Sequence, residues 1–156
     1  MDPNCIFCKI VAGQIPCHKL YEDDWVLAFL DLGPLSAGHV LVIPKHHAVQ
    51  LDELPSEDAA AVGAVLPRIA KAVSQATGTD AYNVLQNNGK PAGQVVMHVH
   101  FHLIPKPAPT TDHTTTSSAP DSPGTPGSGL GIGWPAGKLD DDLAKAMVEK
   151  ITAAFE

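Results

Sequence analysis

Three histidines at alternate positions, His98, His100 and His102, are the residues of this sequence best suited to chemistry. Residues 98–104 are expected to form a strand, in which alternate side chains share one face, so the three imidazoles would face one way and the apolar residues between them the other. Neutral imidazole is a nucleophile near pH 7, and its protonated form is a proton donor. The pattern therefore favours a catalytic row, with one imidazole as nucleophile and a neighbour that holds charge or a proton.

Two other interpretations of this row stay open. One is chance enrichment of histidine on a solvated strand. The other is a metal ion bound by all three side chains. A strand rises about 3.3 Å per residue, which places His98 and His102 roughly 13 Å apart, too far for one ion unless the strand bends sharply. Two neighbouring histidines could still share a metal.

A glycine-bearing turn, residues 87–94, leads directly into the histidine row. Such a turn lets backbone N–H groups approach anionic oxygens closely. An Asn-Gly turn alone is most often a plain hairpin connection. Beside a row of histidines, it is a candidate phosphate cradle.

A second group of chemically suited residues begins with the pair Cys5 and Cys8, which form a CxxC motif. A single CxxC needs two further ligands to hold zinc, and His46 and His47 supply candidates. The alternative is a pair of reduced cysteines without metal.

Composition narrows the classes of protein. The chain has 156 residues, of which 44% are hydrophobic and 17% are charged, with a net charge of −7. The acidic balance argues against a nucleic-acid partner, and no apolar run reaches the ~20 residues of a membrane span. The start, MDPNCIFCKI, lacks a basic stretch followed by an apolar signal segment. We therefore expect a cytoplasmic protein with no membrane partner, in which the three cysteines stay reduced.

The elements that must position these residues follow from periodicity and turn residues. Short polar breaks, Asp23-Asp24 and Gly33-Pro34, separate the first three expected strands. We expect strands at residues 18–22, 25–31, 39–43, 82–85 and 95–104, and helices at residues 4–11, 56–76 and 138–155. The 56–76 helix starts with a capping pattern at Ser56 and contains Pro67, and Leu143, Met147, Ile151 and Phe155 form the apolar stripe of the last helix.

The chain is expected to divide into three parts. Residues 1–106 form the core of the domain, and residues 107–129 form an insertion rich in Pro, Thr, Ser and Gly. That insertion cannot bury enough apolar surface to offset the cost of ordering, so we expect a mobile loop. Residues 130–156 contain Trp134 and the final helix, which complete the domain.

The stretch HVHFHLI resembles the signature of the histidine-triad (HIT) family, and the resemblance covers residues 5–106. It continues upstream through CIFCKIVAGQIP, LAFLDL, GHVLVIPKHH and NNGKPAGQ. The closest similarity is to the Hint-like branch and its zinc-bearing bacterial-type relatives. The resemblance implies an α+β fold: a five-stranded antiparallel sheet with one long helix and a C-terminal helix. It also implies a homodimer in which the sheet continues across the two subunits and Trp134 approaches the partner's site.

This resemblance implies a nucleotide hydrolase that acts on the α-phosphate of nucleoside monophosphate derivatives. The substrates would be purine nucleoside phosphoramidates or dinucleoside polyphosphates. His100 would be the nucleophile that forms a nucleotidyl-histidine intermediate, and His102 would bind the phosphate and assist proton transfer. The alternatives are a nucleotide-binding scaffold with incidental hydrolysis, and a nucleotidyltransferase.

The resemblance also implies a set of nucleotide-binding residues around His100 and His102. Asp31 would hold the ribose hydroxyls, and Phe7, Ile10, Ile15, Phe29 and Leu32 would surround the base. Asn87, Gly93, Gln94 and Val95 would form the phosphate side. Relatives usually carry a hydroxyl residue where Val95 stands, so a side-chain hydrogen bond to phosphate is lost there and the backbone N–H must serve.

For the second group of residues, the resemblance implies a structural Zn²⁺ held by Cys5, Cys8, His47 and His98. This assignment leaves His100 and His102 free for chemistry. Zinc would pin the N-terminal segment against the catalytic strand. His39 is expected to support the site without binding the metal, and the alternative is an ordinary buried histidine.

Overall fold

The computed structural model describes residues 1–107 and 137–155. Residues 108–136 include most of the predicted 107–129 insertion and Trp134, so both predictions lie outside the described residues.

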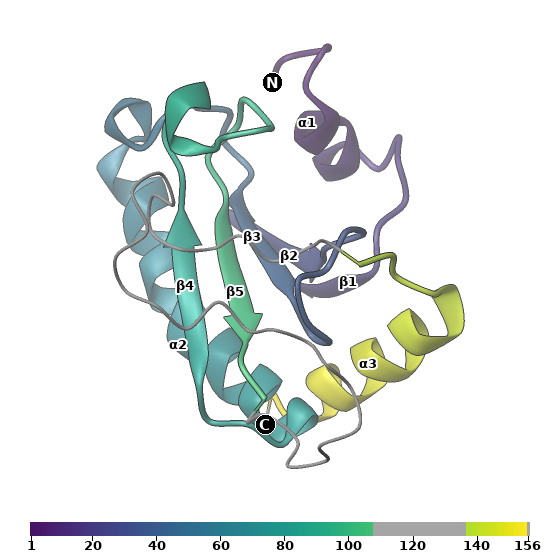
Figure 1. Cartoon of the computed structure of the whole chain (residues 1–156). Helices are drawn as coiled ribbons and strands as arrows, with labels where there is room; N and C mark the ends of the chain where they lie inside the picture. The colour runs from purple at the N-terminus through teal and green to yellow at the C-terminus, as the bar shows by residue number, and fades with distance from the viewer. Residues whose placement is uncertain (108–136, 156) are drawn as a thin grey trace.

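Five strands form one antiparallel sheet in the order β1-β2-β3-β5-β4 (Figure 1). This confirms the predicted five-stranded antiparallel sheet. Both central strands β2 and β3 are buried along their whole length, because the sheet is covered on two faces. The strands are Lys19–Glu22 (β1), Val26–Leu30 (β2), Val40–Pro44 (β3), Tyr82–Gln86 (β4) and Phe101–Pro105 (β5).

One face of the sheet packs against the long helix α2, Ser56–Thr77. The apolar residues Val62, Val65 and Ile69 recur at helical spacing and are buried against alternate residues of β2 and β3. The helix continues through Pro67 and ends at Gly78, which has a φ of 70°. Ser56 is the first helical residue and makes no capping hydrogen bond, so the predicted cap was wrong.

The last helix, α3, spans Asp141–Ala153 beside α2. Its N-cap Asp140 accepts hydrogen bonds from the N–H groups of residues 142 and 143. Leu143 was predicted to lie on the buried stripe but is 69% exposed, and Ala144 is buried in its place. Ala144 belongs to the buried cluster that contains the apolar residues of α2, a position that a pattern of large hydrophobic residues does not predict.

The opposite face of the sheet carries the short helix α1, Ile6–Val11. The alternate residues Leu27, Phe29, Leu41 and Ile43 point to this face and pack against α1. In Figure 1, α1 and the turn around the 3-10 helix η2, Lys90–Ala92, lie at the same end of the molecule. None of the described helices is long and apolar enough to span a membrane.

The strand predicted from residue 95 was wrong at its start, because β5 begins only at Phe101. Before it, the backbone turns: the His98 N–H donates to the Val96 carbonyl at 2.9 Å, and the Val99 N–H donates to the Ala48 carbonyl at 2.8 Å. Of the three histidines, only His102 lies in the strand. The three histidines are therefore not a row on one regular strand.

Candidate active site and metal centre

A cavity of about 1030 Å³ lies on the face of the sheet that carries α1. Its floor comes from strand residues that share this face, including Phe29, Leu41 and Leu85. One wall comes from α1, and another from the turn that precedes β5. Its polar side chains include those of His100, His102 and Asp31.

His100 is held in one tautomer by the main chain. Its Nδ1 lies 2.7 Å from the carbonyl oxygen of His98, and because a carbonyl can only accept, Nδ1 must carry the proton. The Nε2 atom therefore keeps its lone pair. Burial lowers the pKa of His100, against smaller opposing effects of the His98 carbonyl and Asp31, so the ring is neutral near pH 7. A neutral imidazole with a free Nε2 is a ready nucleophile.

A chain of hydrogen bonds holds His102 in the other tautomer, with its proton on Nε2. The Leu35 N–H donates to Nδ1 of His39 at 3.1 Å, so the proton of neutral His39 is on Nε2. That Nε2–H donates to Nδ1 of His102 at 2.9 Å. His102 must then carry its own proton on Nε2. The carboxylate of Asp31 lies 3.5 Å from His39 Nε2 and adds an electrostatic contact.

His100 and His102 are thus complementary neighbours. Their ring centroids are 4.9 Å apart at an interplanar angle of 67°. Burial lowers the pKa of His102 to about 4, with further lowering from the charges that His100 and His39 would carry if protonated. One neutral ring offers a lone pair, and the other offers an N–H donor. This pairing suits attack on an electrophilic centre that bears oxygens able to accept a hydrogen bond.

The depressed pKa of His102 predicts acid sensitivity. Unfolding returns this group to an ordinary pKa of 6.5, whereas the folded protein holds it at about 4. Between these values the unfolded state binds more protons, so the free energy of unfolding should fall as the pH is lowered from about 6.5 to about 4. Urea unfolding of the wild type and of His102→Asn across this range would test it. The free energy of unfolding of the variant should depend less steeply on pH than that of the wild type. An equal slope in both proteins would contradict the prediction.

The turn before β5 is braced by a buried amide. Gln94 accepts a hydrogen bond from the Gly89 N–H at 2.6 Å through Oε1, and its Nε2 donates to the carbonyls of Val49 and Val96. Gly93 has a φ of 87°, a left-handed conformation that a side chain would strain. Gln94 was predicted to bind nucleotide, but the structure places its side chain inside the turn, outside the cavity lining.

Most of the other predicted nucleotide-binding residues line the cavity. Ile15 does not, and sequence reasoning missed Ile6, Leu35 and Leu41, which do. Leu41 pairs with His102 across β3 and β5, a register that the sequence alone does not reveal. The predicted residues that line the cavity are Phe7, Ile10, Phe29, Asp31, Leu32, Asn87, Gly93, Val95, His100 and His102.

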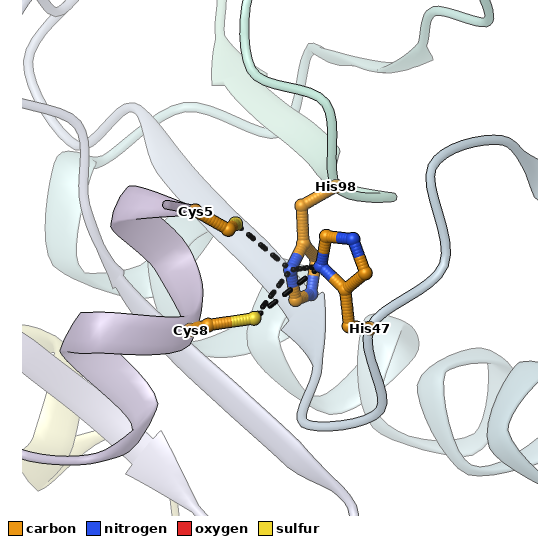
Figure 2. A group of neighbouring side chains, drawn as sticks. All are labelled: Cys5, Cys8, His47 and His98. Atoms are coloured by element: carbon orange, nitrogen blue, oxygen red, sulfur yellow. Dashed lines mark hydrogen bonds between the residues drawn. The ribbon is translucent and has the colours of Figure 1, made fainter. Parts of the chain in front are cut away.

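Four side chains that could hold a metal ion converge near the first turn of α1, as Figure 2 shows. Cys5 Sγ lies 3.5 Å and Cys8 Sγ 3.7 Å from His98 Nδ1. His47 Nδ1 lies 3.3 Å from both Cys8 Sγ and His98 Nδ1. Tetrahedral zinc, with bonds of about 2.3 Å to sulfur and about 2.0–2.1 Å to nitrogen, places its ligand atoms roughly 3.3–3.8 Å apart. The donor set and its spacing therefore fit zinc.

The protonation of His98 also fits a metal ligand. Its Nε2 lies 2.9 Å from the Pro44 carbonyl oxygen, so the proton is on Nε2 and the Nδ1 lone pair points into the cluster. Burial lowers the pKa of His98 to about 4, which keeps this lone pair free near pH 7. The Asp2 N–H donates to Cys8 Sγ at 3.3 Å.

A second group of possible ligands, Asp31, His39 and His102, has the wrong protonation for a metal. The Nδ1 atom of His39 accepts from the Leu35 N–H, so its Nε2 carries the proton and has no lone pair to offer. We interpret this group as the hydrogen-bonded chain described above. His39 was expected to support the zinc site; the structure instead places it against His102. No local sequence signal reveals that contact between residues 39 and 102.

Comparisons with known proteins find relatives that match most of this chain. The family described as HIT domain matches residues 12–108. The adenosine 5'-monophosphoramidase of Schizosaccharomyces pombe is 47% identical over 153 residues, covering 98% of this chain and 99% of that protein. The adenylylsulfatase of Arabidopsis thaliana is 52% identical over 106 residues, covering 68% of this chain and 54% of that protein.

Solved structures show the same fold. A zinc-bound histidine triad family protein from Mycobacterium smegmatis superposes with a TM-score of 0.73 at 33% identity. The match covers 97% of this chain and 93% of that one.

Proposed function

This chain belongs to the HIT family, and from that premise we propose that it hydrolyses purine nucleoside phosphoramidates at the α-phosphate, through a nucleotidyl intermediate on His100. The observation that carries the proposal is the pair of opposite tautomers in the cavity. His100 presents an Nε2 lone pair, and His102 presents an Nε2–H.

In the first step, the Nε2 lone pair of His100 attacks the α-phosphorus, and the bond from phosphorus to the leaving nitrogen breaks. The amine departs with a proton that enters from solvent. His100 is then bonded to phosphorus through Nε2 and still protonated on Nδ1, so its ring is cationic. The His98 carbonyl that accepts the Nδ1–H at 2.7 Å stabilises this cation. Water then attacks phosphorus, releases the nucleoside monophosphate and two protons, and restores neutral His100.

The other cavity residues are assigned roles in holding the nucleotide. The Nε2–H of His102 donates to a phosphoryl oxygen, where it opposes the charge that develops during attack. Asp31, which lines the cavity beside Leu32, accepts from the ribose hydroxyls. Phe7, Ile10 and Phe29 supply the apolar surface for the purine.

The charge of the cavity favours phosphoramidates over dinucleoside polyphosphates. Asp31 is the one charged side chain in the lining that the described residues provide, and no Lys or Arg is among them. A phosphoramidate brings one negative charge, whereas a polyphosphate brings several that a lining without a cationic side chain would leave uncompensated. Each uncompensated charge costs about 1–3 kcal/mol.

We therefore expect kcat/KM for adenosine 5'-phosphoramidate to exceed that for diadenosine tetraphosphate by about 100-fold or more, because the three additional charges of the tetraphosphate, at about 1 kcal/mol each, raise the barrier by about 3 kcal/mol. Steady-state kinetics with both substrates on the same preparation measures this ratio, and product analysis identifies the monophosphate. Comparable values for the two substrates would refute the assignment. No turnover of either would refute the hydrolase proposal.

We propose that the cluster of Cys5, Cys8, His47 and His98 holds a structural Zn²⁺. Four protein donors leave no open position, so the ion would supply cross-linking of α1 to the chain before β5 and no reaction chemistry. Thiol ligands must be reduced to bind metal, which is consistent with the cytoplasmic location expected from the sequence.

We propose that the protein is a homodimer whose sheet continues across β4. This strand is at the edge of the sheet, and its Tyr82 and Val84 are 43% and 49% exposed, which is unusual for apolar residues on a free edge. Light scattering should give twice the monomer mass of 16.4 kDa. Val84→Lys should shift the protein to monomer, because an edge lysine opposes strand pairing. A monomeric wild type would rule out this assembly.

A further inference from the structure

One residue, His98, belongs to both the four-donor cluster and the active site. Its ring nitrogen Nδ1 lies in the cluster, and its main-chain carbonyl accepts the Nδ1–H of His100 at 2.7 Å. The other ring nitrogen is held by the Pro44 carbonyl at 2.9 Å. The ring is therefore anchored on both sides. A backbone displacement at His98 that takes this ring out of the cluster would also move the carbonyl that sets the tautomer of His100.

The short helix α1 also belongs to both sites. Cys5 is the N-cap residue of α1, and Cys8 lies within the helix. Ile6 and Phe7, which lie between the two cysteines, and Ile10, which follows them, line the cavity. The Phe7 ring lies edge-on to His98 and His100, with centroids 5.8 Å and 5.3 Å away. One wall of the cavity therefore stands on the segment that carries both thiols.

Nothing within α1 itself fixes its position. It has six residues and its N-cap residue makes no side-chain hydrogen bond. An isolated helix of this length is unstable in water, so its placement depends on tertiary anchors. Among the described residues, those anchors are the packing of Phe7, Ile10 and Val11 on the sheet and the two cysteines of the cluster.

We propose that the four-donor cluster positions the active site, so that metal occupancy and nucleotide binding are energetically coupled. Cys5, Cys8 and His47 are then positioning residues: they act on the nucleotide through α1 and on His100 through the His98 carbonyl. This inference rests on the proposed nucleotide site and on metal binding by the cluster.

Coupling between two sites is reciprocal, which gives the inference a strict test. If Zn²⁺ raises the affinity for a nucleotide by some factor, the nucleotide must raise the affinity for Zn²⁺ by the same factor. Couplings of this kind are typically about 5–150-fold. We expect a factor of at least about fivefold, since the whole α1 wall and the His98 carbonyl depend on the cluster.

The first experiment measures both sides of this cycle on the full chain. AMP is titrated calorimetrically into zinc-loaded and zinc-depleted protein, and zinc affinity is measured by chelator competition with and without saturating AMP. The release of Zn²⁺ into excess chelator should be slower with AMP present, and this measurement needs no stable metal-free form. Equal AMP affinities and equal zinc release would overturn the inference and leave the proposed function intact. Failure of AMP to bind either form would instead refute the nucleotide site.

Variants at His47 separate positioning from general stability, because this residue lies outside both α1 and the chain before β5. His47→Ala should weaken AMP binding by at least about fivefold, raise KM and lower kcat, at a temperature where the protein is folded. His47→Cys restores a fourth donor and should recover both metal and AMP affinity. Cys17→Ser, a half-buried cysteine outside the cluster, is the matched control and should change neither.

Two outcomes at these positions would contradict the inference. A cluster that is only structural would lower Tm in His47→Ala and leave the AMP affinity of the folded protein unchanged. A His47→Cys protein that binds zinc and still binds AMP weakly would show that the imidazole, and not the occupied cluster, supports the nucleotide site.

Discussion

Replacing His100 by Ala lowers kcat/KM for adenosine 5'-phosphoramidate by about 10⁴–10⁶-fold, the range expected when a covalent nucleophile is removed. The reason is geometric. His100 has its Nδ1–H bound to the His98 carbonyl, so Nε2 is the free nitrogen in the cavity. The neighbouring His102 points its own lone pair at His39 and cannot substitute.

The same variant should still bind AMP within about tenfold of the wild type, because the ribose and base contacts are intact and only one phosphate contact of about 0.5–1.5 kcal/mol is lost. Single-turnover kinetics and calorimetry measure the two quantities. His46→Ala is the matched control: this histidine is exposed, does not line the cavity and should keep full activity.

Mass spectrometry of rapidly quenched wild type should find a nucleotidyl adduct on His100. The adduct should be absent from His100→Ala. Substantial activity in that variant, or an adduct on another side chain, would refute the nucleophile assignment.

We expect the replacement of Cys8 by Ser to abolish the proposed zinc binding and to destabilise the fold. Cys8 Sγ contacts Nδ1 of both His47 and His98 and accepts the Asp2 N–H, so its loss opens the cluster at its centre. A hydroxyl is a poor replacement for a thiolate on zinc. We expect zinc content to fall from about one per chain to near zero. We also expect the free energy of unfolding to decrease by about 3 kcal/mol, as is typical when a buried network of polar contacts is broken.

That loss corresponds to a decrease in Tm of about 6–12 °C for a domain of this size. Elemental analysis and calorimetry of Cys8→Ser beside Cys17→Ser measure the two effects. The Cys17 variant should retain its metal, because Cys17 lies outside the cluster. Wild type that holds no zinc when purified in its presence would contradict the metal assignment.

Much of the fold could be predicted from local patterns. The alternating and continuous apolar runs indicate the strands of the sheet, and the apolar residues of α2 keep their helical period past Pro67. These predictions hold because burial of one face or stripe imposes a period that the sequence must carry. The errors occur where another contact decides. Leu143 is exposed because Ala144 fits the α2 face, and β5 starts late because the Val99 N–H pairs with Ala48.

The sequence by itself determined which residue types were available for chemistry, and its family resemblance named two candidate catalytic histidines and four candidate metal ligands. Only the tertiary structure decided how they are used. Cys8 and His47 are 39 positions apart, and Cys5 and His98 are 93 positions apart, yet their donor atoms lie within 3.5 Å. The tautomers of His100 and His102 depend on a carbonyl and on His39. Hydrogen-bond direction and metal geometry are set by which groups meet in space, and spacing along the chain does not carry that information.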